Sequence, residues 1–250
     1  MRSTLIATGS YLPEKIMTNA DLEKLVDTSD EWIVQRSGIK SRHIAADGQT
    51  TGDMAIAAGR KALEASGLAP DQIDLIVVAT TTPDNTFPAV AAKVQAALGI
   101  PAGIAFDVQA VCTGFVYALT VADSFIRTGQ AKHALVIGAD KMSSIVDWND
   151  RTTCVLFADG AGAVILKAED GEPGNVKEAG IHASRLYANG AQSDLLYVNG
   201  GPSSTGSTGH IVMEGREVFK YAVSYMAGAV TDVMAKAGVA PADIDWLIPH

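Results

Sequence analysis

Two cysteines are the residues of this chain best suited to covalent chemistry, and one of them lies at an unusual place. Cys112 falls within DVQAVCTGFVYAL (107–119), where an extended apolar run gives way to helical spacing. The following apolar residues recur on one face of a helix: Phe115, Leu119, Ala122 and Ile126. The first turn of that helix would hold the cysteine, so we expect Cys112 at a strand-to-helix joint.

This joint would suit a nucleophile. Free backbone N–H groups and the positive end of the helix dipole would face the sulfur, lower the pKa of the thiol and favour the thiolate. The same N–H groups could stabilise the oxyanion of a tetrahedral thioester intermediate. An unreactive buried cysteine is the alternative, and position alone leaves both readings open. Cys154, within TTCVLFADG (152–160), has only a strand-like environment, so we predict that it belongs to the core.

Composition excludes several classes of function. Asp and Glu (28) outnumber Lys and Arg (19), and the net charge of −9 argues against a nucleic-acid partner. Two cysteines are too few for a disulfide framework and fit a reducing, cytoplasmic setting. The five histidines have neither HxxxH nor HExxH spacing, so no metal site is predicted. No apolar run is long enough for a signal peptide or a bilayer span, so we expect no membrane partner.

The elements that would position the cysteine alternate between strands and helices. Four runs are expected to be strands: Ile73–Thr80, Ile104–Val111, His133–Asp140 and Ala161–Lys167. Because their hydrophobicity is continuous, we expect a mainly parallel sheet between helices. Helices are predicted over Asp53–Ser66 and Gly114–Arg127, each followed by a glycine stop.

Two glycine-rich motifs could suggest nucleotide binding, and both fail. GAGAVI (160–165) lacks the third glycine of a dinucleotide fingerprint and precedes a strand, so a tight turn is predicted. GGPSSTGSTG (200–209) has no phosphate-binding lysine and is predicted to be a loop.

An internal repeat is the clearest organisational feature. ASGLAPDQIDLIVV (65–78) returns as KAGVAPADIDWLIP (236–249). In each copy we expect a helix to end at the glycine, a proline turn to follow, and a buried strand to begin. Common loop requirements could produce part of this likeness, but the shared spacing favours duplication of an α/β unit.

The repeat divides the chain into two halves. Residues 1–170 would form the N-terminal half, which carries the nucleophilic cysteine, and residues 171–250 would begin the C-terminal half. AEDGEPGNVKE (168–178) reads as a surface linker. The first copy continues well past its strand, whereas the second stops at His250. Because a sheet broken off there leaves uncovered edges, we expect the second half to be truncated after His250.

Several motifs together resemble one enzyme family, the β-ketoacyl-acyl carrier protein synthase III family. They are DVQAVCTGF (107–115), TSDEWIVQRSGIKSRHIA (28–45), DRTTCVLFADGAGA (150–163), MEGREVFKYAV (213–223) and IDWLIPH (244–250). The resemblance covers the whole chain in register. It implies an α/β fold of the thiolase-like type, with two duplicated α/β halves and mixed sheets between helix layers, the second half being incomplete here. It also implies a homodimer and an acyltransferase that initiates fatty acid biosynthesis.

The resemblance implies a two-stage reaction. Cys112 would take an acyl group from acetyl-CoA or another short acyl-CoA, and CoA would leave. Malonyl-acyl carrier protein would lose CO2, and its carbanion would attack the acyl-cysteine to give acetoacetyl-acyl carrier protein. A histidine matching His250 and an asparagine beyond residue 250 would hydrogen-bond the thioester carbonyl. Without the resemblance His250 stays open, since a lone histidine at a strand end is more often structural. No cofactor is expected, because acyl-CoA is a substrate.

The resemblance also assigns a CoA site. Trp32 and Arg151 match the pair that holds the adenine by stacking and cation–π attraction, and Thr28 matches a contact to the nucleotide end. Three basic residues could present positive charge to the CoA phosphates: Arg36, Lys40 and Arg42. A solvated surface face is the usual role of such a cluster, but Trp32 one turn before Arg36 favours a ligand rim.

The acyl pocket and the carrier-protein surface are implied in the same way. Phe87 resembles a residue that reaches across the dimer to shape the acyl pocket. Four more residues match pocket walls, though ordinary core is the alternative: Phe157, Met213, Gly215 and Phe219. Arg216 and Lys220 are candidates for docking the acyl carrier protein.

Two other functions stay open at this point. One is an initiating synthase of a polyketide or quinolone pathway with the same fold, which a panel of acyl-CoAs and malonyl donors would distinguish. The other is an inactive thiolase-fold partner that binds acyl chains or a sister subunit. Such a protein would be expected to lack the nucleophile, so the presence of Cys112 argues against it.

Overall fold

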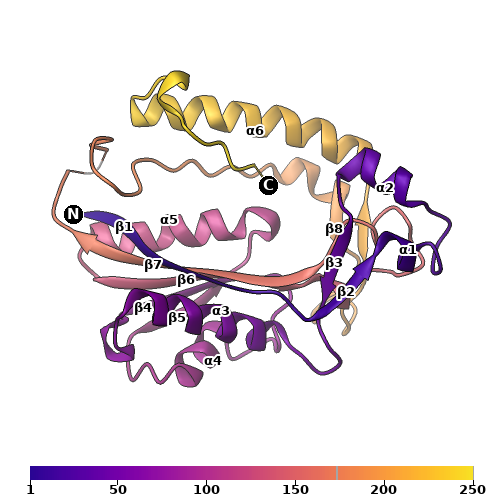
Figure 1. Ribbon diagram of the computed structural model, residues 1–250, viewed down its shortest axis with the longest axis horizontal. Helices are drawn as coiled ribbons and strands as arrows, with labels where there is room; N and C mark the ends of the chain where they lie inside the picture. The colour runs from indigo at the N-terminus through magenta and orange to yellow at the C-terminus, as the bar shows by residue number, and fades with distance from the viewer. Residues whose placement is uncertain (173, 250) are drawn as a thin grey trace.

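The computed structural model describes residues 1–172 and 174–249, and a five-stranded sheet forms its centre (Figure 1). The strand order is β1-β7-β6-β4-β5. These strands span Arg2–Tyr11 (β1), Leu75–Ala79 (β4), Ile104–Val108 (β5), His133–Lys141 (β6) and Asp159–Glu169 (β7). All four predicted strands are therefore confirmed, with small shifts at their ends.

The sheet is mixed rather than mainly parallel. β4 pairs in parallel with β5 and β6, whereas β7 pairs antiparallel with both β6 and β1. Continuous hydrophobicity indicates that a strand is buried on both faces, but it does not show in which direction the strand runs relative to its neighbours. The prediction of parallel pairing is therefore wrong for two of the four strand pairs. The predicted turn at 160–165 is also wrong, because these residues lie inside β7.

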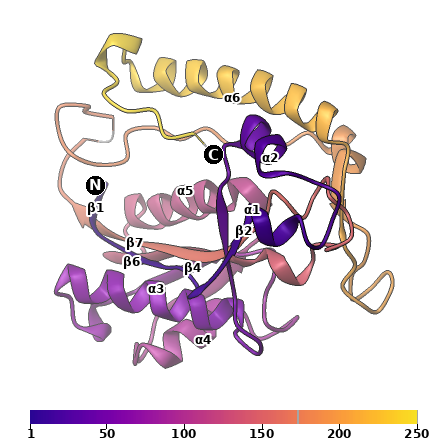
Figure 2. The ribbon, with the colours of Figure 1, turned by 45° about the vertical axis from the view of Figure 1, so that its right-hand side comes forward.

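Helices cover both faces of the sheet. α3 (Thr51–Ser66) and α4 (Val90–Ala97) lie on one face, and α5 (Gly114–Arg127) lies on the other (Figures 1 and 2). Strand β4 shows the division, since Ile76 and Val78 pack towards α3 and α4 while Leu75 and Val77 pack towards α5. The predicted helices at 53–66 and 114–127 are confirmed, as is the apolar face of α5.

Smaller elements gather at one end of the central sheet. A two-stranded sheet joins β2 (Lys15–Thr18) to β3 (Ser41–Ile44), with α1 (Asn19–Leu22) and α2 (Asp30–Ser37) between them. A second two-stranded sheet joins β8 (Leu196–Val198) to β9 (Ile211–Met213), and residues 200–209 form the predicted loop between them. Short 3-10 turns complete this region: η2 (Val111–Thr113), η3 (Met142–Ser144) and η4 (Gly190–Leu195).

The repeat has the expected structure up to its proline turn. α3 ends before Gly67 and α6 (Gly215–Ala237) ends before Gly238, both glycines being left-handed with φ of 70° and 69°. Matching 3-10 turns follow, η1 (Pro70–Gln72) and η5 (Pro241–Asp243). The copies then differ, because the first continues into β4 whereas residues 244–249 form no strand.

The predicted second strand is therefore wrong for the described residues. Trp246, Leu247 and Ile248 are largely exposed, and no described strand lies hydrogen-bonded to them. A β-strand requires hydrogen bonds to a neighbouring strand, so an apolar run without such a neighbour does not become one. The segment passes between α5 and α6, and α6 itself has no buried residue (Figures 1 and 2).

Candidate active site

Cys112 lies at the joint that the sequence predicts. It is the middle residue of η2, between the end of β5 and the start of α5, and its side chain is exposed. Cys154 is fully buried in an apolar cluster with Ile33, Ile145 and Val155, as predicted for a core cysteine. Of the two thiols, only that of Cys112 is open to a substrate.

The backbone immediately before Cys112 is strained. Val111 has a φ of 49°, and no other described residue except glycine has a positive φ. A β-branched side chain in this left-handed conformation is a genuine outlier, and such strain concentrates at functional sites. The sequence gives no signal of it, since valine is among the least suited residues for this conformation.

The surroundings of Cys112 raise the pKa of its thiol. Partial desolvation by the neighbouring protein is the main cause, and the negative charge of Asp140 acts in the same direction. The cysteine's own backbone N–H opposes both. The expectation of a lowered pKa is therefore wrong here. Cys112 sits in a 3-10 turn ahead of α5 and faces a carboxylate, so desolvation and charge outweigh the single donor.

Asp140 organises the loop that faces Cys112. Its carboxylate accepts hydrogen bonds from the backbone N–H of Thr81 (2.7 Å) and from the hydroxyls of Thr80 (3.2 Å) and Thr82 (3.4 Å). Burial raises the pKa of Asp140, and these donors oppose that shift. Asp140 is not among the predicted site residues. The carboxyl ends of the parallel strands β4 and β6 meet here, so that rule could have found it.

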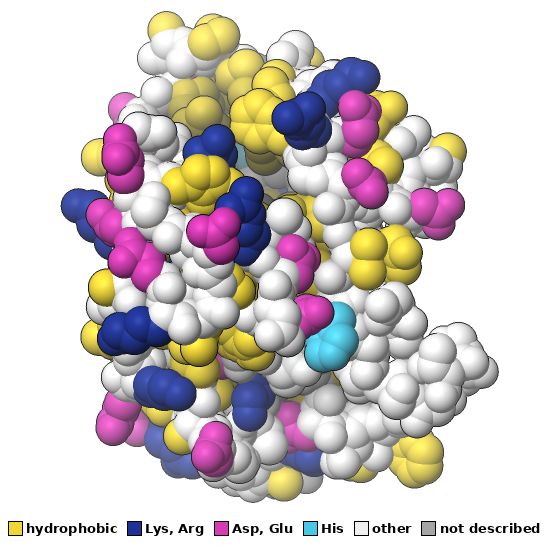
Figure 3. All heavy atoms as spheres, turned by 90° about the vertical axis from the view of Figure 1, so that its right-hand side faces the viewer, with side chains coloured by type: hydrophobic (Ala, Val, Ile, Leu, Met, Phe, Trp, Pro, Cys, Tyr) yellow, Lys and Arg dark blue, Asp and Glu magenta, His cyan; other side chains and the backbone are white. Residues whose placement is uncertain are grey.

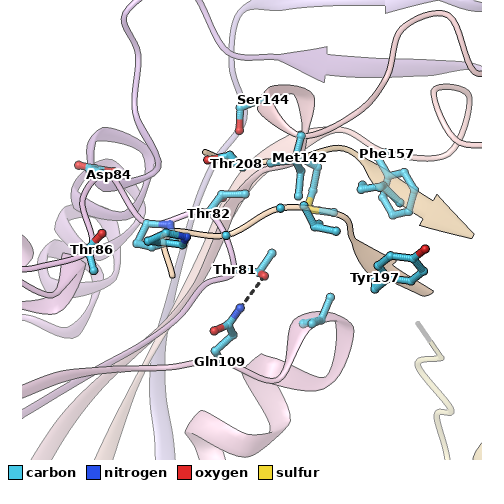
Figure 4. A pocket seen from close by; sticks show the side chains of 18 of the residues that line it. Thr81, Thr82, Asp84, Thr86, Gln109, Met142, Ser144, Phe157, Tyr197 and Thr208 are labelled. Atoms are coloured by element: carbon cyan, nitrogen blue, oxygen red, sulfur yellow. Dashed lines mark hydrogen bonds between the residues drawn. The ribbon is translucent and has the colours of Figure 1, made fainter. Parts of the chain in front are cut away.

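A cavity of about 880 Å3 opens beside Cys112 (Figure 4). The side-chain amide of Gln109 donates to the hydroxyl of Thr81 at 3.1 Å across its floor. In Figure 4 the aromatic rings of Phe157 and Tyr197 lie at one end, and Asp84 and Thr86 lie at the other. One end is therefore apolar and the other polar, as a substrate with unlike ends requires.

Only one of the predicted pocket walls lines this cavity. Phe157 does, whereas Phe87 is 82% exposed outside it and Met213 lies in β9 beside the lining residue Leu196. Gly215 begins α6, and Phe219 is 71% exposed on that helix. α6 has no buried residue, and neither Gly215 nor Phe219 lines the cavity beside Cys112.

A second constellation surrounds Trp32. The guanidinium carbons of Arg36 and Arg151 lie 4.3 Å and 5.6 Å from the centre of its ring, within cation–π range. The hydroxyl of Thr28 is buried and has no hydrogen-bond partner among residues 1–172 and 174–249. Two of the predicted residues, Arg36 and Arg151, therefore lie over the half-buried ring of Trp32. Thr28 lies two residues before the start of α2, the helix that carries this ring.

The predicted basic rim is only partly present. Arg36 and Lys40 are exposed, but Arg42 is 2% exposed and faces the interior, so its predicted role towards phosphates is wrong. Arg42 belongs to β3, where side chains alternate between the two faces, and its position falls on the inner face. Figure 3 shows basic side chains mixed with acidic ones on this side of the molecule.

One apolar cluster connects the two constellations. Trp32 packs against the cluster that contains Ile145 and Ile211, and both of these line the cavity beside Cys112. Phe157 and Leu196 belong to the same group. The helix that carries Trp32 and the wall of the cavity therefore share one apolar cluster.

The remaining predicted residues lie elsewhere. His250 is outside the described residues. Arg216 and Lys220 are exposed on α6, where Lys220 forms an ion pair of 3.5 Å with Glu217. Within residues 1–172 and 174–249, no three His, Cys, Asp or Glu side chains gather in a way that could hold a metal ion. Among the same residues, none of the helices has the length and apolarity needed to cross a membrane.

Comparisons with known proteins agree with this geometry. The family described as 3-oxoacyl-(acyl-carrier-protein) synthase III matches residues 106–190, the part that holds Cys112. The β-ketoacyl-(acyl-carrier-protein) synthase III of Rhodospirillum centenum is 59% identical over 250 residues, which is 100% of this chain and 77% of that protein.

Two solved structures share the fold. The 3-oxoacyl-(acyl-carrier-protein) synthase III of Aquifex aeolicus has a TM-score of 0.89 and 48% identity, over 97% of this chain and 74% of that one. The priming β-ketosynthase of the R1128 polyketide biosynthetic pathway has a TM-score of 0.86 and 31% identity, over 97% and 72%. The chain is thus similar both to fatty-acid and to polyketide initiating enzymes, and more so to the former.

Proposed function

The chain belongs to the β-ketoacyl-acyl carrier protein synthase III family, and we propose that Cys112 is the residue on which its reaction takes place. The protein is an acyltransferase, the initiating condensing enzyme of fatty acid synthesis. The observation that carries the proposal for Cys112 is its exposed thiol beside the cavity, just before α5, while Cys154 is buried.

The first stage moves the acyl group to the protein. The Cys112 thiolate attacks the carbonyl carbon of the acyl-CoA thioester, and the new carbon–sulfur bond replaces the bond to CoA, which leaves as a thiolate and takes up a proton. Backbone N–H groups of the turn around Cys112 would stabilise the oxyanion of the tetrahedral intermediate. Because the pKa of the thiol is raised, deprotonation is part of the work of this stage.

The second stage forms the carbon–carbon bond. Malonyl-acyl carrier protein loses CO2, and its carbanion attacks the acyl-Cys112 carbonyl and expels the cysteine thiolate. His250 would donate a hydrogen bond to the malonyl carbonyl as charge develops on it. Loss of CO2 supplies the electron pair of the nucleophile, so this chemistry calls for no redox or metal cofactor.

The substrate-binding roles follow from placement. Trp32 and Arg151 would hold the adenine of CoA, with Arg36 on the same ring. Thr28 would contact the nucleotide end through its hydroxyl, which has no partner within the described residues. Phe157 would border the acyl group in the cavity.

We also propose that the enzyme works as a cytoplasmic homodimer. Phe87, on the loop that borders the cavity, is a large aromatic side chain 82% exposed. The adjacent edge strand β5 exposes Ile104 as well. An exposed aromatic beside an unpaired strand edge is a surface that a second copy could cover.

The test is formation of acetoacetyl-acyl carrier protein from acetyl-CoA and malonyl-acyl carrier protein, followed by mass spectrometry. Cys112→Ala should abolish the product, and Cys154→Ala should retain it. A Cys112→Ala enzyme that still condenses at the wild-type rate would contradict the proposal. The second candidate, priming of a polyketide, is favoured by the 31% likeness to such an enzyme. Preference for a starter other than acetyl-CoA in a panel of acyl-CoAs would support it instead.

A further inference from the structure

Arg42 is a buried cation that the proposed reaction does not use. It is 2% exposed, and its Nε (3.1 Å) and Nη2 (2.6 Å) both donate to the carbonyl oxygen of Val155. Its Nη1 donates to the Oδ1 of Asn19 at 2.6 Å. Within the described residues these acceptors, a backbone carbonyl and a side-chain amide, are neutral, and Arg42 forms no ion pair with a carboxylate. Burying a cation costs free energy unless its donors are satisfied. The three hydrogen bonds of Arg42 offset part of this cost, and they tie Asn19 to the backbone of Val155.

Asn19 extends this contact to both ends of α2. Its Nδ2 donates to the Oδ1 of Asp30 at 2.7 Å and to the carbonyl oxygen of Ile39 at 2.9 Å. Asp30 is the first residue of α2, and Ile39 directly follows Gly38, which ends it. A helix of eight residues with one buried side chain, Ile33, cannot fix its own position. The Asn19 amide therefore clamps the helix that carries Trp32.

Val155 extends the contact in the other direction, to Arg151. The turn that carries Arg151 closes where the backbone N–H of Cys154 donates to the carbonyl of Asp150 at 3.0 Å, one residue before Val155. The Nη1 of Arg151 itself donates to the carbonyl oxygen of Asp27 at 2.8 Å, next to the start of α2. One buried guanidinium thus joins the segment of Trp32 to the segment of Arg151.

We propose that Arg42, acting through Asn19 and Asp30, is a positioning residue that sets the separation between Trp32 and Arg151 for the adenine nucleotide of acyl-CoA. This inference rests on the proposed role of Trp32 and Arg151. Arg42 touches neither the ligand nor the reacting atoms. Its effect should therefore be confined to donors that carry the nucleotide.

The experiment compares two acyl donors with the same thioester. Acetyl-CoA carries the adenine nucleotide, and acetyl-pantetheine lacks it. The KM and kcat for each are measured in Asp30→Ala and in the matched control Glu31→Ala. Both variants remove one exposed carboxylate from the first turn of α2, but only Asp30 accepts from Asn19. Arg42→Lys gives a third measurement, and Trp32→Ala tests the adenine site itself.

We expect Asp30→Ala to raise the KM for acetyl-CoA about three- to tenfold, the scale of one lost hydrogen bond, with kcat nearly unchanged. The KM for acetyl-pantetheine should stay the same, and Glu31→Ala should change neither. Arg42→Lys should follow Asp30→Ala, because lysine cannot bridge Val155 and Asn19 with a planar fork. Because Asp30 is exposed, the Asp30→Ala variant should fold even if the Arg42→Lys variant does not.

Three outcomes would overturn the inference. The first is an equal effect of Asp30→Ala and Glu31→Ala on acetyl-CoA. The second is an equal rise of KM for both donors in Asp30→Ala, which would indicate a general structural role. In the third, Trp32→Ala leaves the KM for acetyl-CoA unchanged. That result would reject the adenine site, and the positioning role with it, whereas the first two reject only the positioning role.

Discussion

Among single residues, Cys112 has the surroundings that matter most for the proposed reaction. The residue before it is strained, its thiol is partly desolvated, and Asp140 places a carboxylate near it. The strain at Val111 lowers the stability of the folded protein. Desolvation and the charge of Asp140 disfavour the thiolate of Cys112. These features are consistent with a site where stability is given up for a fixed orientation of the sulfur.

The strain at Val111 leads to a prediction about stability. Asparagine tolerates the left-handed conformation, so Val111→Asn should raise the free energy of unfolding by about 1 kcal/mol, measured by urea denaturation. Val116→Asn is the control, because Val116 is equally exposed (46% against 47%) but lies in right-handed helix α5. It should not stabilise the protein. Equal changes in both variants would show that the backbone of Val111 stores no strain.

The charge of Asp140 leads to a prediction about pH. Alkylation of Cys112 by iodoacetamide requires the thiolate, so its rate should rise with pH only above the ordinary thiol range, because desolvation and Asp140 raise the pKa. Asp140→Asn removes the repulsive charge, lowers that pKa and should move the rise to lower pH.

Asp71→Asn is the matched control for Asp140→Asn, since Asp71 is exposed in η1 at the opposite end of β4. It should leave the alkylation profile unchanged. A profile that is the same in all three proteins, or one that moves to higher pH in Asp140→Asn, would contradict the role of this carboxylate.

At the scale of elements, strands and helices near Cys112 are held by side chains from neighbouring elements. α4 has no side-chain cap of its own, and the carboxylate of Asp107 in β5 accepts from the first two N–H groups, of Val90 (2.7 Å) and Ala91 (2.8 Å). The strand leading to Cys112 thereby fixes the start of the helix that follows the Phe87 loop.

Removal of this cap should be measurable. Asp107→Ala leaves two N–H groups at the start of α4 without an acceptor and should lower the free energy of unfolding by about 1–2 kcal/mol in urea denaturation. Asp107→Asn keeps one oxygen acceptor and should lose less. If Asp107→Ala unfolds at the same urea concentration as the wild type, Asp107 does not cap α4.

The predictable elements were those with strong local signals. Apolar runs bounded by glycine predict β4, β6, β7, α3 and α5, and the strand-to-helix joint at Cys112 follows from the change of spacing. β1 (Arg2–Tyr11) was missed, because it mixes polar and apolar residues and is held by pairing with a strand more than 150 residues away. Residues 244–249 were wrongly predicted to form a strand for the opposite reason. They have the local apolar pattern of a strand, but no described strand pairs with them.

The site residues also divide into those with a local sequence signal and those without one. Cys112, Trp32, Arg36 and Arg151 are predictable from motifs. In the structure Cys112 is exposed, and both arginines lie over the half-buried ring of Trp32. Asp140 bonds to Thr81 and Arg42 bonds to Val155, contacts that no local spacing reveals. For Asp140 alone, the rule that the carboxyl ends of parallel strands meet could have supplied the signal. Polar residues that act through other residues are the ones that sequence reasoning misplaces.

For the whole molecule, the proposed homodimer can be tested at Phe87, which is 82% exposed. Phe87→Asp places a charge on the surface proposed for the dimer and should raise the dimer dissociation constant by about tenfold or more, measured by sedimentation. Leu25→Asp, at another exposed apolar residue (55%), is the control and should leave association unchanged. Unchanged association in Phe87→Asp would place the interface elsewhere.

The central claim is that Cys112 carries the acyl group. The most direct measurement is incubation with acetyl-CoA alone, without malonyl-acyl carrier protein, followed by proteolysis and mass spectrometry of the peptides. We expect one acetyl group on the peptide that contains Cys112 and none on the peptide that contains Cys154. Acetyl on Cys154, or condensation product formed with no acetyl group ever detected on Cys112, would contradict it.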